Sequence, residues 1–346
     1  MLDSEGEVAS ALMRAQSCMI LCHVMPDGDA IGSSLALARA LTRLGKKVKL
    51  VSVDPVPEVY RFLESEIRFE PASTITREAM GLYETLVFLD CTHKDRIGSL
   101  ADLIGPNHFI VNVDHHTTNS FFGHVNYVDR DAAAVGEQVL RIIDRLGVSL
   151  DEDMAKSLYA AILTDTGSFR YENTKPRVFR VAARLLEAGA KPSEISEAIY
   201  ESRSFSSLKV LGLALTTLKT TAAGKVAWMT MSREMLVDAG GSESDTEGII
   251  NYARAIRGVE IGLFFREVEA STTRVGLRSR AVVDVSMIAG EFGGGGHPRA
   301  AGCTVHLPLK EAEKVVVQRA VRAVREAFPD AGGGTGTGGE GGDGGC

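Results

Sequence analysis

Short apolar runs alternate with amphipathic stretches of helix length over the first half of the chain. The expected strands are residues 19–22, 48–53, 86–89 and 109–113. The expected helices are residues 30–44, 133–146, 153–163 and 176–188. This alternation is typical of a parallel, doubly wound α/β sheet with helices on its faces. We therefore expect an α/β fold for this half of the chain.

The pattern changes after Gly224. The expected strands there are residues 226–231, 261–266, 273–278 and 301–307, and the expected helices are residues 246–256, 283–292 and 309–328. This predicts a second, smaller α/β domain. The expected organisation is a catalytic domain over 1–192, a helical linker over 193–222, a second domain over 223–330 and a disordered glycine-rich tail over 331–346.

Composition narrows the class of protein. A chain of 346 residues with 45% hydrophobic content is long enough for two globular domains. Its five cysteines are scattered and include no C-x-x-C pair, which argues against a disulfide framework and a structural zinc site. No apolar stretch is long enough to span a membrane, and the first residues are acidic rather than basic. We expect a cytoplasmic protein.

The net charge of −7 gives an expectation about partners. Proteins that hold long nucleic acids usually present a large basic face that neutralises phosphates. An acidic chain fits a small anionic substrate better than a long strand. Bound divalent cations would reverse the sign of the field around a cluster of acids.

Clusters of aspartate and histidine follow the expected strands of the first half. In parallel α/β sheets the carboxyl ends of neighbouring strands meet at one edge, where ligands bind. A further acid, Asp165, ends an apolar stretch of helix length and could join them. The candidate residues are His23, Asp27 and Asp29, then Asp90, then Asp114, His115 and His116, and finally Asp165.

Carboxylates with imidazoles favour Mn²⁺, Fe²⁺, Co²⁺ or Zn²⁺ in a catalytic site. Two such ions can activate a water and stabilise charge during phosphoryl transfer, and Asp90, alone at its strand end, is the natural bridge. The alternative is that some of these acids only cap helices, as Asp29 could. Asp54 also follows a strand, but no second polar ligand accompanies it, so we leave it out.

The second half offers a glycine run, Gly293 to Gly296, followed by His297. The run is neither a Walker loop nor a dinucleotide fingerprint. Consecutive glycines can form an anion-binding nest, although they can also form a plain turn. Nearby basic and polar residues favour phosphate binding. The candidate substrate residues are Arg278, Ser279, Gly294, Gly295, Gly296, His297 and Arg299.

These motifs together give a family resemblance. The chain resembles the DHH phosphoesterases, named after the triplet Asp114-His115-His116, over nearly its whole length except the tail. Residues 23–33, 89–92 and 164–169 look like the family's other motifs, and residues 293–302 look like the signature of the DHH-associated C-terminal domain. The resemblance implies an active site in the cleft between the two domains.

Within the family, the length of the chain, its two domains and its glycine run resemble those of the NrnA-like group. This resemblance implies hydrolysis of short oligonucleotides such as pApA to mononucleotides and removal of the 3′-phosphate from 3′-phosphoadenosine 5′-phosphate, with two Mn²⁺ ions and no membrane contact. A homodimer is also compatible with the family. One ion would be held by His23, Asp27 and Asp90, and the other by Asp29, Asp90, His115 and Asp165.

The resemblance also implies roles outside the metal ligands. Asp114 would orient a histidine, and His116 would face the scissile phosphate. Arg278, Ser279 and His297 would hold the substrate's terminal phosphate. Two other functions stay open at this point: a phosphodiesterase for cyclic dinucleotides such as c-di-AMP, and a nucleotide-binding regulator that has lost catalysis. Relatives of the RecJ type, which act on long strands, and manganese-dependent pyrophosphatases fit less well.

Overall fold

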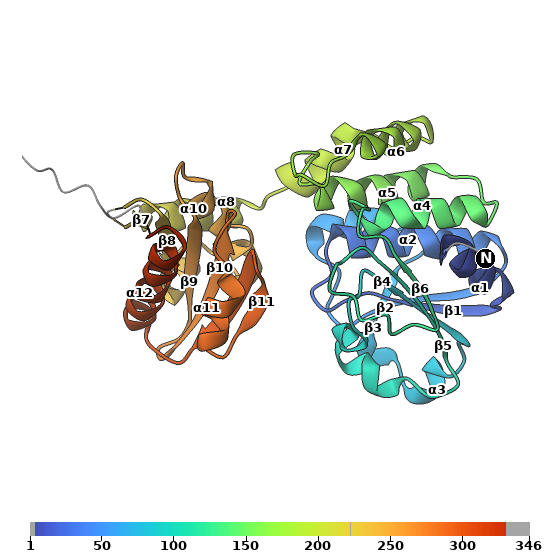
Figure 1. Ribbon diagram of the computed structural model, residues 1–346, viewed down its shortest axis with the longest axis horizontal. Helices are drawn as coiled ribbons and strands as arrows, with labels where there is room; N and C mark the ends of the chain where they lie inside the picture. Colours follow the sequence, from blue (N-terminus) through green and yellow to red (C-terminus); the bar gives the residue numbers. More distant parts are fainter. Residues whose placement is uncertain (1–3, 222, 330–346) are drawn as a thin grey trace, which may run out of the picture. The chain divides into compact units, whose positions relative to one another are not determined.

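The computed structural model describes residues 4–221 and 223–329. The chain divides between Ser202 and Arg203 into two compact units, which Figure 1 shows in blue to green and in yellow to red. The α/β fold predicted from the sequence is confirmed in both units. The tail predicted over 331–346 lies outside the described residues. In the described part of the chain, no helix has the length and apolar character needed to cross a membrane.

The first unit alternates strands and helices. Its elements are α1 (Ser4–Arg14), β1 (Ser17–Leu21), α2 (Gly28–Arg43), β2 (Lys47–Ser52), η1 (Glu58–Leu63), β3 (Phe69–Pro71), η2 (Ala72–Thr74), α3 (Arg77–Met80), β4 (Thr85–Leu89), η3 (Lys94–Leu103), β5 (Phe109–Asp114), β6 (Val125–Val128), α4 (Val135–Arg145), α5 (Glu152–Asp165), α6 (Pro176–Glu187), α7 (Pro192–Ser196) and η4 (Glu197–Glu201).

The strands of the first unit form one sheet in the order β3-β2-β1-β4-β5-β6, and each neighbouring pair is parallel. The order reverses between β1 and β4, which are far apart in the chain. Open α/β sheets bind ligands at the carboxyl ends of the strands at such a reversal. His23 follows β1 and Asp90 follows β4, so both residues lie at this point of the sheet.

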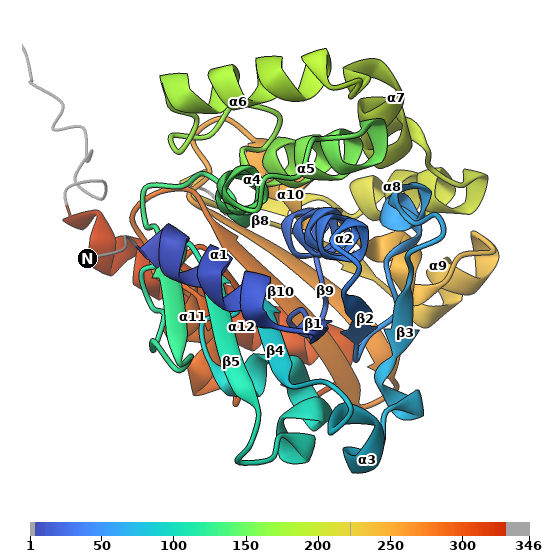
Figure 2. The same cartoon turned by 90° about the vertical axis from the view of Figure 1, so that its right-hand side faces the viewer.

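Both faces of the sheet are covered. In β1, Ile20 packs with residues of α1, α2, α4 and α5, whereas Met19 and Leu21 pack on the other face with Met80 of α3 and Ile97 of η3. Figure 2 shows α2, α4 and α5 together on one side of the sheet. This two-sided burial explains why the strands read as continuous apolar runs rather than as alternating ones.

The second unit is a smaller mixed sheet with helices on both faces. Its elements are α8 (Phe205–Thr216), β7 (Lys219–Thr220), β8 (Val226–Met231), α9 (Arg233–Asp238), η5 (Glu243–Thr246), α10 (Ile250–Ala255), β9 (Ile261–Glu269), β10 (Thr272–Ser279), α11 (Val285–Glu291), β11 (Gly295–His297), β12 (Ala300–Val305) and α12 (Leu309–Ala327).

The strand order of the second sheet is β11-β12-β10-β9-β8-β7. The pair β8 and β9 is parallel, and the other pairs are antiparallel. Val316 of α12 packs on one face of this sheet, whereas Val210 of α8 and Ala253 of α10 pack on the other. Ile195 of α7 belongs to the core of the first unit, so the segment expected as a linker divides between the two units.

Some elements differ from the expectation. The helix expected over 246–256 is shorter, because Ser242 and Asp245 cap the separate short turn η5 and Gly248 has a φ of 76°. The sequence pattern also missed α1, α9 and the short strands β3, β6, β7 and β11. Strands of two to four residues carry too few alternating positions to be recognised from the pattern.

Candidate functional site

The segment after β1 presents three of the expected metal ligands, His23 and Asp27 in the loop and Asp29 in the first turn of α2. Asp27 caps α2, since its Oδ1 accepts hydrogen bonds from the backbone N–H groups of Asp29 at 3.1 Å and Ala30 at 3.0 Å. The capping role that the sequence left open for Asp29 therefore belongs to Asp27. Asp29 lies in the first turn of α2, is almost fully buried, and caps a different helix.

Asp29 is held by the N-terminus of α4. Its Oδ2 accepts from the N–H of Val135 at 2.6 Å, and its Oδ1 accepts from the N–H of Gly136 at 2.9 Å and from the hydroxyl of Ser33 at 2.9 Å. The first N–H groups of a helix have no partner within the helix and favour negative charge. These bonds fix the Asp29 carboxylate in one orientation.

Close packing of α2 against α5 brings Asp29 near Asp165. A Cβ at Gly32 would lie 2.2 Å from the backbone oxygen of Ser157, and one at Gly28 would lie 2.5 Å from the Thr164 hydroxyl. Only glycine permits this approach at both positions. The α5 helix ends at Asp165, so the contact delivers that carboxylate to the cluster.

The structure brings the expected ligands together in two neighbouring groups. His23, Asp27 and Asp90 form one group, and Asp29, His115 and Asp165 form the other; within each group the donor atoms lie within 4.8 Å of one another. Asp90 also forms such a group with His115 and His116. The ends of the three strands β1, β4 and β5 and the end of helix α5 therefore converge as the sequence predicted.

Asp90 lies between the two groups. Its Oδ2 is 3.3 Å from Nε2 of His23, and its Oδ1 is 3.6 Å from Nε2 of His115. The residue is buried and has a φ of 57°, in the left-handed region that side chains other than glycine rarely adopt. Such backbone strain is typical of functional sites.

The donor set fits divalent metal ions. Within the described residues, Oδ1 of Asp90 is a buried oxygen that accepts no hydrogen bond. Its nearest ring nitrogens are those of His116 at 3.3 Å and His115 at 3.6 Å. A buried carboxylate oxygen without a hydrogen bond favours a bound cation. The other donors are imidazole nitrogens and carboxylate oxygens, with no cysteine, which suits a catalytic centre rather than a structural zinc site.

Hydrogen bonds to carbonyl groups fix the orientation of two histidines. Nδ1 of His23 lies 2.8 Å from the Val24 oxygen, and Nδ1 of His115 lies 3.1 Å from the Ala132 oxygen. A carbonyl can only accept, so Nδ1 carries the proton in both rings. Nε2 is left to face the carboxylates, as is usual for metal-binding histidines.

In the absence of a bound metal ion, the clustered carboxylates shift the pKa values of the neighbouring side chains. Burial alone would lower the pKa of His23, but Asp27 and Asp90 raise it to about 10, and the charges of Asp90, Asp29 and Asp165 raise that of His115 to about 9 against the same effect. Burial and nearby negative charge, opposed by His115, raise the pKa of Asp165 to about 7. This excess of negative charge favours a cation.

A third histidine is held by the buried carboxylate of Asp114. Nδ1 of His116 donates to Oδ1 of Asp114 at 2.8 Å. Burial alone would lower the pKa of His116, but Asp114 and the charge of Asp90 raise it. His116 is about one third exposed, so it can meet a substrate, whereas Asp114 is fully buried.

The sequence analysis missed Asn119. Its Nδ2 lies 2.6 Å from Oδ2 of Asp114 and 3.1 Å from the Cys91 carbonyl, next to Asp90. The same group also reaches Asn112 on β5. A single asparagine therefore connects the loop after β4 with the triplet after β5. A polar residue three positions beyond the triplet was the only signal in the sequence.

In the second unit, β10 ends in the expected pair Arg278 and Ser279. Ser279 bonds to the Pro298 oxygen, which connects this strand end to the segment after the glycine run. Arg278 is half-buried, and burial together with the charge of Arg254 lowers its pKa. No carboxylate among the described residues lies within ion-pair distance of either guanidinium group. Two neighbouring cations without an acidic partner among the described residues favour a bound anion.

The glycine run has a different geometry from the expected nest. The N–H groups of Gly293 and Gly294 bond to the Gly290 and Ala289 carbonyls and so close α11. A Cβ at Gly294 would lie 2.2 Å from the Gly302 oxygen, and one at Gly296 would lie 2.5 Å from the Ala300 oxygen. Close packing against β12 therefore explains Gly294 and Gly296. Gly295 begins the edge strand β11, which ends at His297.

Arg299 has a structural contact as well. Its Nη1 donates to the Val283 carbonyl at 3.0 Å, and its backbone oxygen accepts from Ser279. Arg299 thus stabilises the loop that precedes α11. Among the sequence-predicted arginines, Arg278 is the better placed to meet an anion.

Comparison with known proteins agrees with this architecture. Residues 17–162 match the model of the DHH family, N-terminal domain, and residues 224–330 match that of the DHHA1 domain. An exopolyphosphatase-related protein from Bacteroides fragilis has a similar fold, with a TM-score of 0.88, 24% identity and coverage of 94% of this chain and 98% of that one.

Curated relatives are similar over most of their length. A bifunctional oligoribonuclease and PAP phosphatase NrnA from Thermus thermophilus is 38% identical over 315 residues, which are 90% of each chain. The protein of the same name from Bacillus subtilis is 25% identical over 85% of this chain and 90% of that one. The chain therefore belongs to the DHH family of proteins with a DHHA1 domain, together with the bifunctional oligoribonucleases and PAP phosphatases.

Proposed function

We propose that this chain is a phosphoesterase that hydrolyses short oligonucleotides to mononucleotides and removes the 3′-phosphate from 3′-phosphoadenosine 5′-phosphate. The names of its curated relatives support the two activities. The observation that carries the proposal is the position of Asp90, whose two oxygens face different histidines at 3.3 and 3.6 Å. This arrangement suits a carboxylate that is shared between two metal ions.

The metal ligands follow from the two groups. His23, Asp27 and Asp90 would hold one Mn²⁺, and Asp29, Asp90, His115 and Asp165 would hold the other. Bound ions would supply a water of lowered pKa and neutralise charge on the phosphoryl group. The chain's own part is to hold these side chains in place, through the α4 amides on Asp29 and the carbonyl groups on His23 and His115.

His116 and Asp114 would act on the leaving group. Burial alone would lower the pKa of His116, but the Asp114 carboxylate raises it and so favours the protonated imidazole. A protonated imidazole can stabilise charge on the phosphate and pass its proton to the leaving oxygen as the ester bond breaks. Asn119 would keep Asp114 in place for this role.

The second unit would bind the substrate's terminal phosphate. Arg278 and Arg254 offer two guanidinium groups without an acidic partner among the described residues, and Ser279 adds a hydroxyl at the same strand end. Arginine binds phosphate with paired hydrogen bonds. His297 and the edge of β11 remain candidates for the same function.

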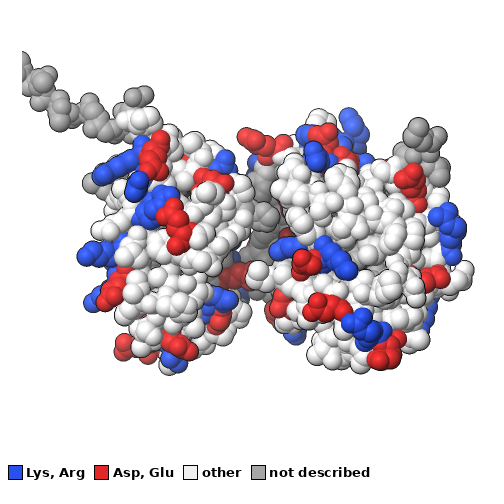
Figure 3. Space-filling view, turned by 60° about the horizontal axis from the view of Figure 1, so that its bottom comes forward, with Lys and Arg blue, Asp and Glu red and all other residues white. Residues whose placement is uncertain are grey.

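Charge supports a short substrate. On the face drawn in Figure 3, lysine and arginine side chains lie among aspartate and glutamate side chains on both units. This mixture fits the net charge of −7 and gives that face no broad basic track for a long strand.

Three further expectations from the sequence stay predictions. They are an active site in the cleft between the two domains, a location in the cytoplasm and assembly as a homodimer.

The test is an Asp90→Asn variant. Asparagine keeps the size of the side chain but removes the charge that two ions would share. We expect the parent to bind two Mn²⁺ per chain and to hydrolyse pApA, and the variant to lose turnover with at least one Mn²⁺. Asp95→Asn, an exposed acid in the segment that follows β4, is the control. Undiminished hydrolysis by Asp90→Asn would contradict the proposal.

A further inference from the structure

Asp54, which the sequence analysis set aside, contacts the loop that carries two of the candidate metal ligands. Its Oδ2 accepts a hydrogen bond from the backbone N–H of Met25 at 2.7 Å. Met25 lies midway between His23 and Asp27. The contact joins residues 29 positions apart in the sequence, from the ends of the neighbouring strands β1 and β2.

Met25 needs such an anchor. It has a φ of 53°, in the left-handed region, and its side chain is 76% exposed, so no core packing holds the residue in place. Residues with a Cβ adopt this conformation only where the surroundings impose it. Without the bond, the backbone between His23 and Asp27 would relax toward conformations that do not present both side chains to Asp90.

The remaining contacts of the loop leave this role to Asp54. Val24 is tied by its N–H to the Arg96 carbonyl at 2.8 Å, and Asp27 is tied to the first turn of α2. Met25 lies between these two fixed points. Asp54 is itself fixed, because the Ser52 hydroxyl donates to the Asp54 carbonyl at 2.7 Å and turns the chain at the end of β2.

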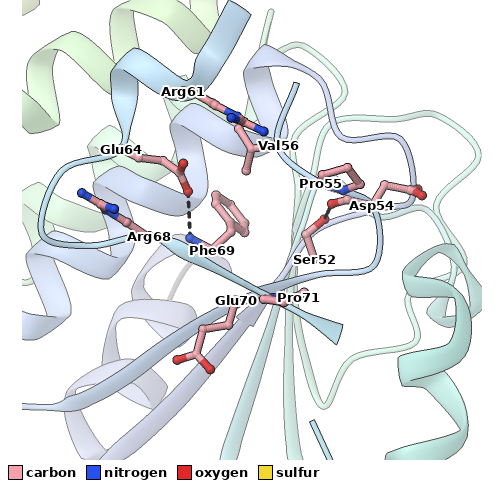
Figure 4. Close-up of a pocket in the computed structure, with 10 residues that line it drawn as sticks. All are labelled: Ser52, Asp54, Pro55, Val56, Arg61, Glu64, Arg68, Phe69, Glu70 and Pro71. Atoms are coloured by element: carbon pink, nitrogen blue, oxygen red, sulfur yellow. Dashed lines mark hydrogen bonds between the residues drawn. The ribbon is translucent and has the colours of Figure 1, made fainter. Parts of the chain in front are cut away.

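Asp54 also lines a cavity of about 480 Å³ at the carboxyl ends of β2 and β3, together with Glu70, Phe69 and Arg61. Figure 4 shows Asp54 at one side of this cavity, next to Ser52 and Pro55, and Glu70 at another. Glu70 pairs with Lys49 at 2.7 Å, and within the described part of the chain no hydrogen bond joins it to residues 23–27. It therefore serves as a control that alters the same cavity.

We propose that Asp54 is a positioning residue for the metal centre: its carboxylate holds Met25 in the left-handed conformation that lets His23 and Asp27 face Asp90. The inference rests on the proposed metal site. It assigns Asp54 to the ion that His23 and Asp27 would hold together with the shared Asp90. Asp29, Asp90, His115 and Asp165 would hold the other ion without any contribution from Asp54.

The test measures Mn²⁺ binding directly, by electron paramagnetic resonance of the free ion, without reference to hydrolysis. Asp54→Ala should weaken one of two Mn²⁺ sites by about tenfold, the size of effect usual for groups that orient metal ligands. Asp54→Asn keeps an acceptor oxygen and should bind like the parent. Glu70→Ala should also bind like the parent. If Asp54→Ala fails to fold, Asp54→Ser, whose hydroxyl is too short to reach Met25, replaces it.

Three outcomes would overturn the inference. The Mn²⁺ affinity of Asp54→Ala could be unchanged, or both Mn²⁺ sites could be weakened equally. An Asp54→Asn variant that binds Mn²⁺ as weakly as Asp54→Ala would show that charge, rather than the bond to Met25, matters. The proposed function is tested separately. A parent that binds two Mn²⁺ but cleaves no nucleotide would refute the function and leave the Asp54 test intact.

Discussion

Nδ1 of His116 donates a hydrogen bond of 2.8 Å to Oδ1 of the fully buried Asp114. The pair joins a partly exposed imidazole to a carboxylate that cannot reach solvent. Asp114 is anchored in turn by the N–H groups of His115 and His116 and by Asn119. This arrangement presents the His116 ring beside the proposed metal ligand Asp90, as expected for a group that assists departure of the leaving oxygen.

The first prediction concerns the leaving group. His116→Ala should lower kcat for pApA by about 10²–10⁴, the usual contribution of a general acid. A nucleotide p-nitrophenyl ester needs no proton on its departing oxygen and should be much less affected. Steady-state kinetics on the two substrates give the comparison. Equal losses on both would show that His116 does not protonate the leaving group.

The second prediction concerns pH. Burial alone would lower the pKa of His116, but the hydrogen bond to Asp114 and its charge raise it, so activity should fall as the pH rises through that raised pKa. Asp114→Asn removes this charge and lowers the pKa of His116. The alkaline limb of the kcat profile should therefore move to lower pH. A profile that keeps its alkaline limb at saturating Mn²⁺ would contradict this role of Asp114.

The third prediction concerns the contact between α2 and α5. Gly32→Ala places a Cβ 2.2 Å from the Ser157 oxygen, so the helices must separate. We expect the free energy of unfolding to fall by about 1–3 kcal/mol, as for other overpacked cores. Urea unfolding followed by circular dichroism measures the change.

The matched control is Gly105→Ala in the same unit, where a Cβ would make an ordinary contact of 3.7 Å with His108. Gly32→Ala should also weaken Mn²⁺ binding, because Asp29 and Asp165 move apart, whereas Gly105→Ala should leave it unchanged. A Gly32→Ala protein with parental stability and parental Mn²⁺ affinity would mean that the close approach of the helices is not needed.

The fourth prediction concerns Arg278. Arg278→Ala should raise KM for pApA by about ten- to hundredfold, the worth of hydrogen bonds to a charged group, with little change in kcat. ApA lacks the terminal phosphate, so its KM should not depend on Arg278. Arg274→Ala, on the same strand but 61% exposed and paired with Glu243, is the control. Equal effects on pApA and ApA would exclude the phosphate contact.

The doubly wound sheet could be predicted because both faces of β1, β4 and β5 are buried, which makes these strands continuous apolar runs in the sequence. Candidate metal ligands follow directly after each of these strands. The sequence also predicted which residues converge, since parallel strands end at the same edge. It did not predict how they are held. The α4 amides reach Asp29 from 106 and 107 positions away, and Asp54 reaches Met25 from 29 positions away. Such bonds depend on tertiary structure and leave no local pattern.

The sequence alone leaves the role of the glycine run open. A glycine can be needed for a ligand or for another strand, and the sequence does not distinguish the two. The structure gives Gly294 and Gly296 a packing reason, the close approach of β12. For Arg254 the structure adds a candidate ligand contact instead. Its charge acts on Arg278 because α10 packs against β10, and this contact leaves no pattern in the sequence.

The most direct measurement is hydrolysis by the Mn²⁺-loaded protein of an RNA length series from pApA to a 24-nucleotide strand, with 3′-phosphoadenosine 5′-phosphate and c-di-AMP assayed in parallel. The account predicts that kcat/KM is highest for the dinucleotide and falls with length, with phosphate release from 3′-phosphoadenosine 5′-phosphate. A preference for c-di-AMP or for the 24-nucleotide strand, or no hydrolysis of any of these substrates, would contradict it.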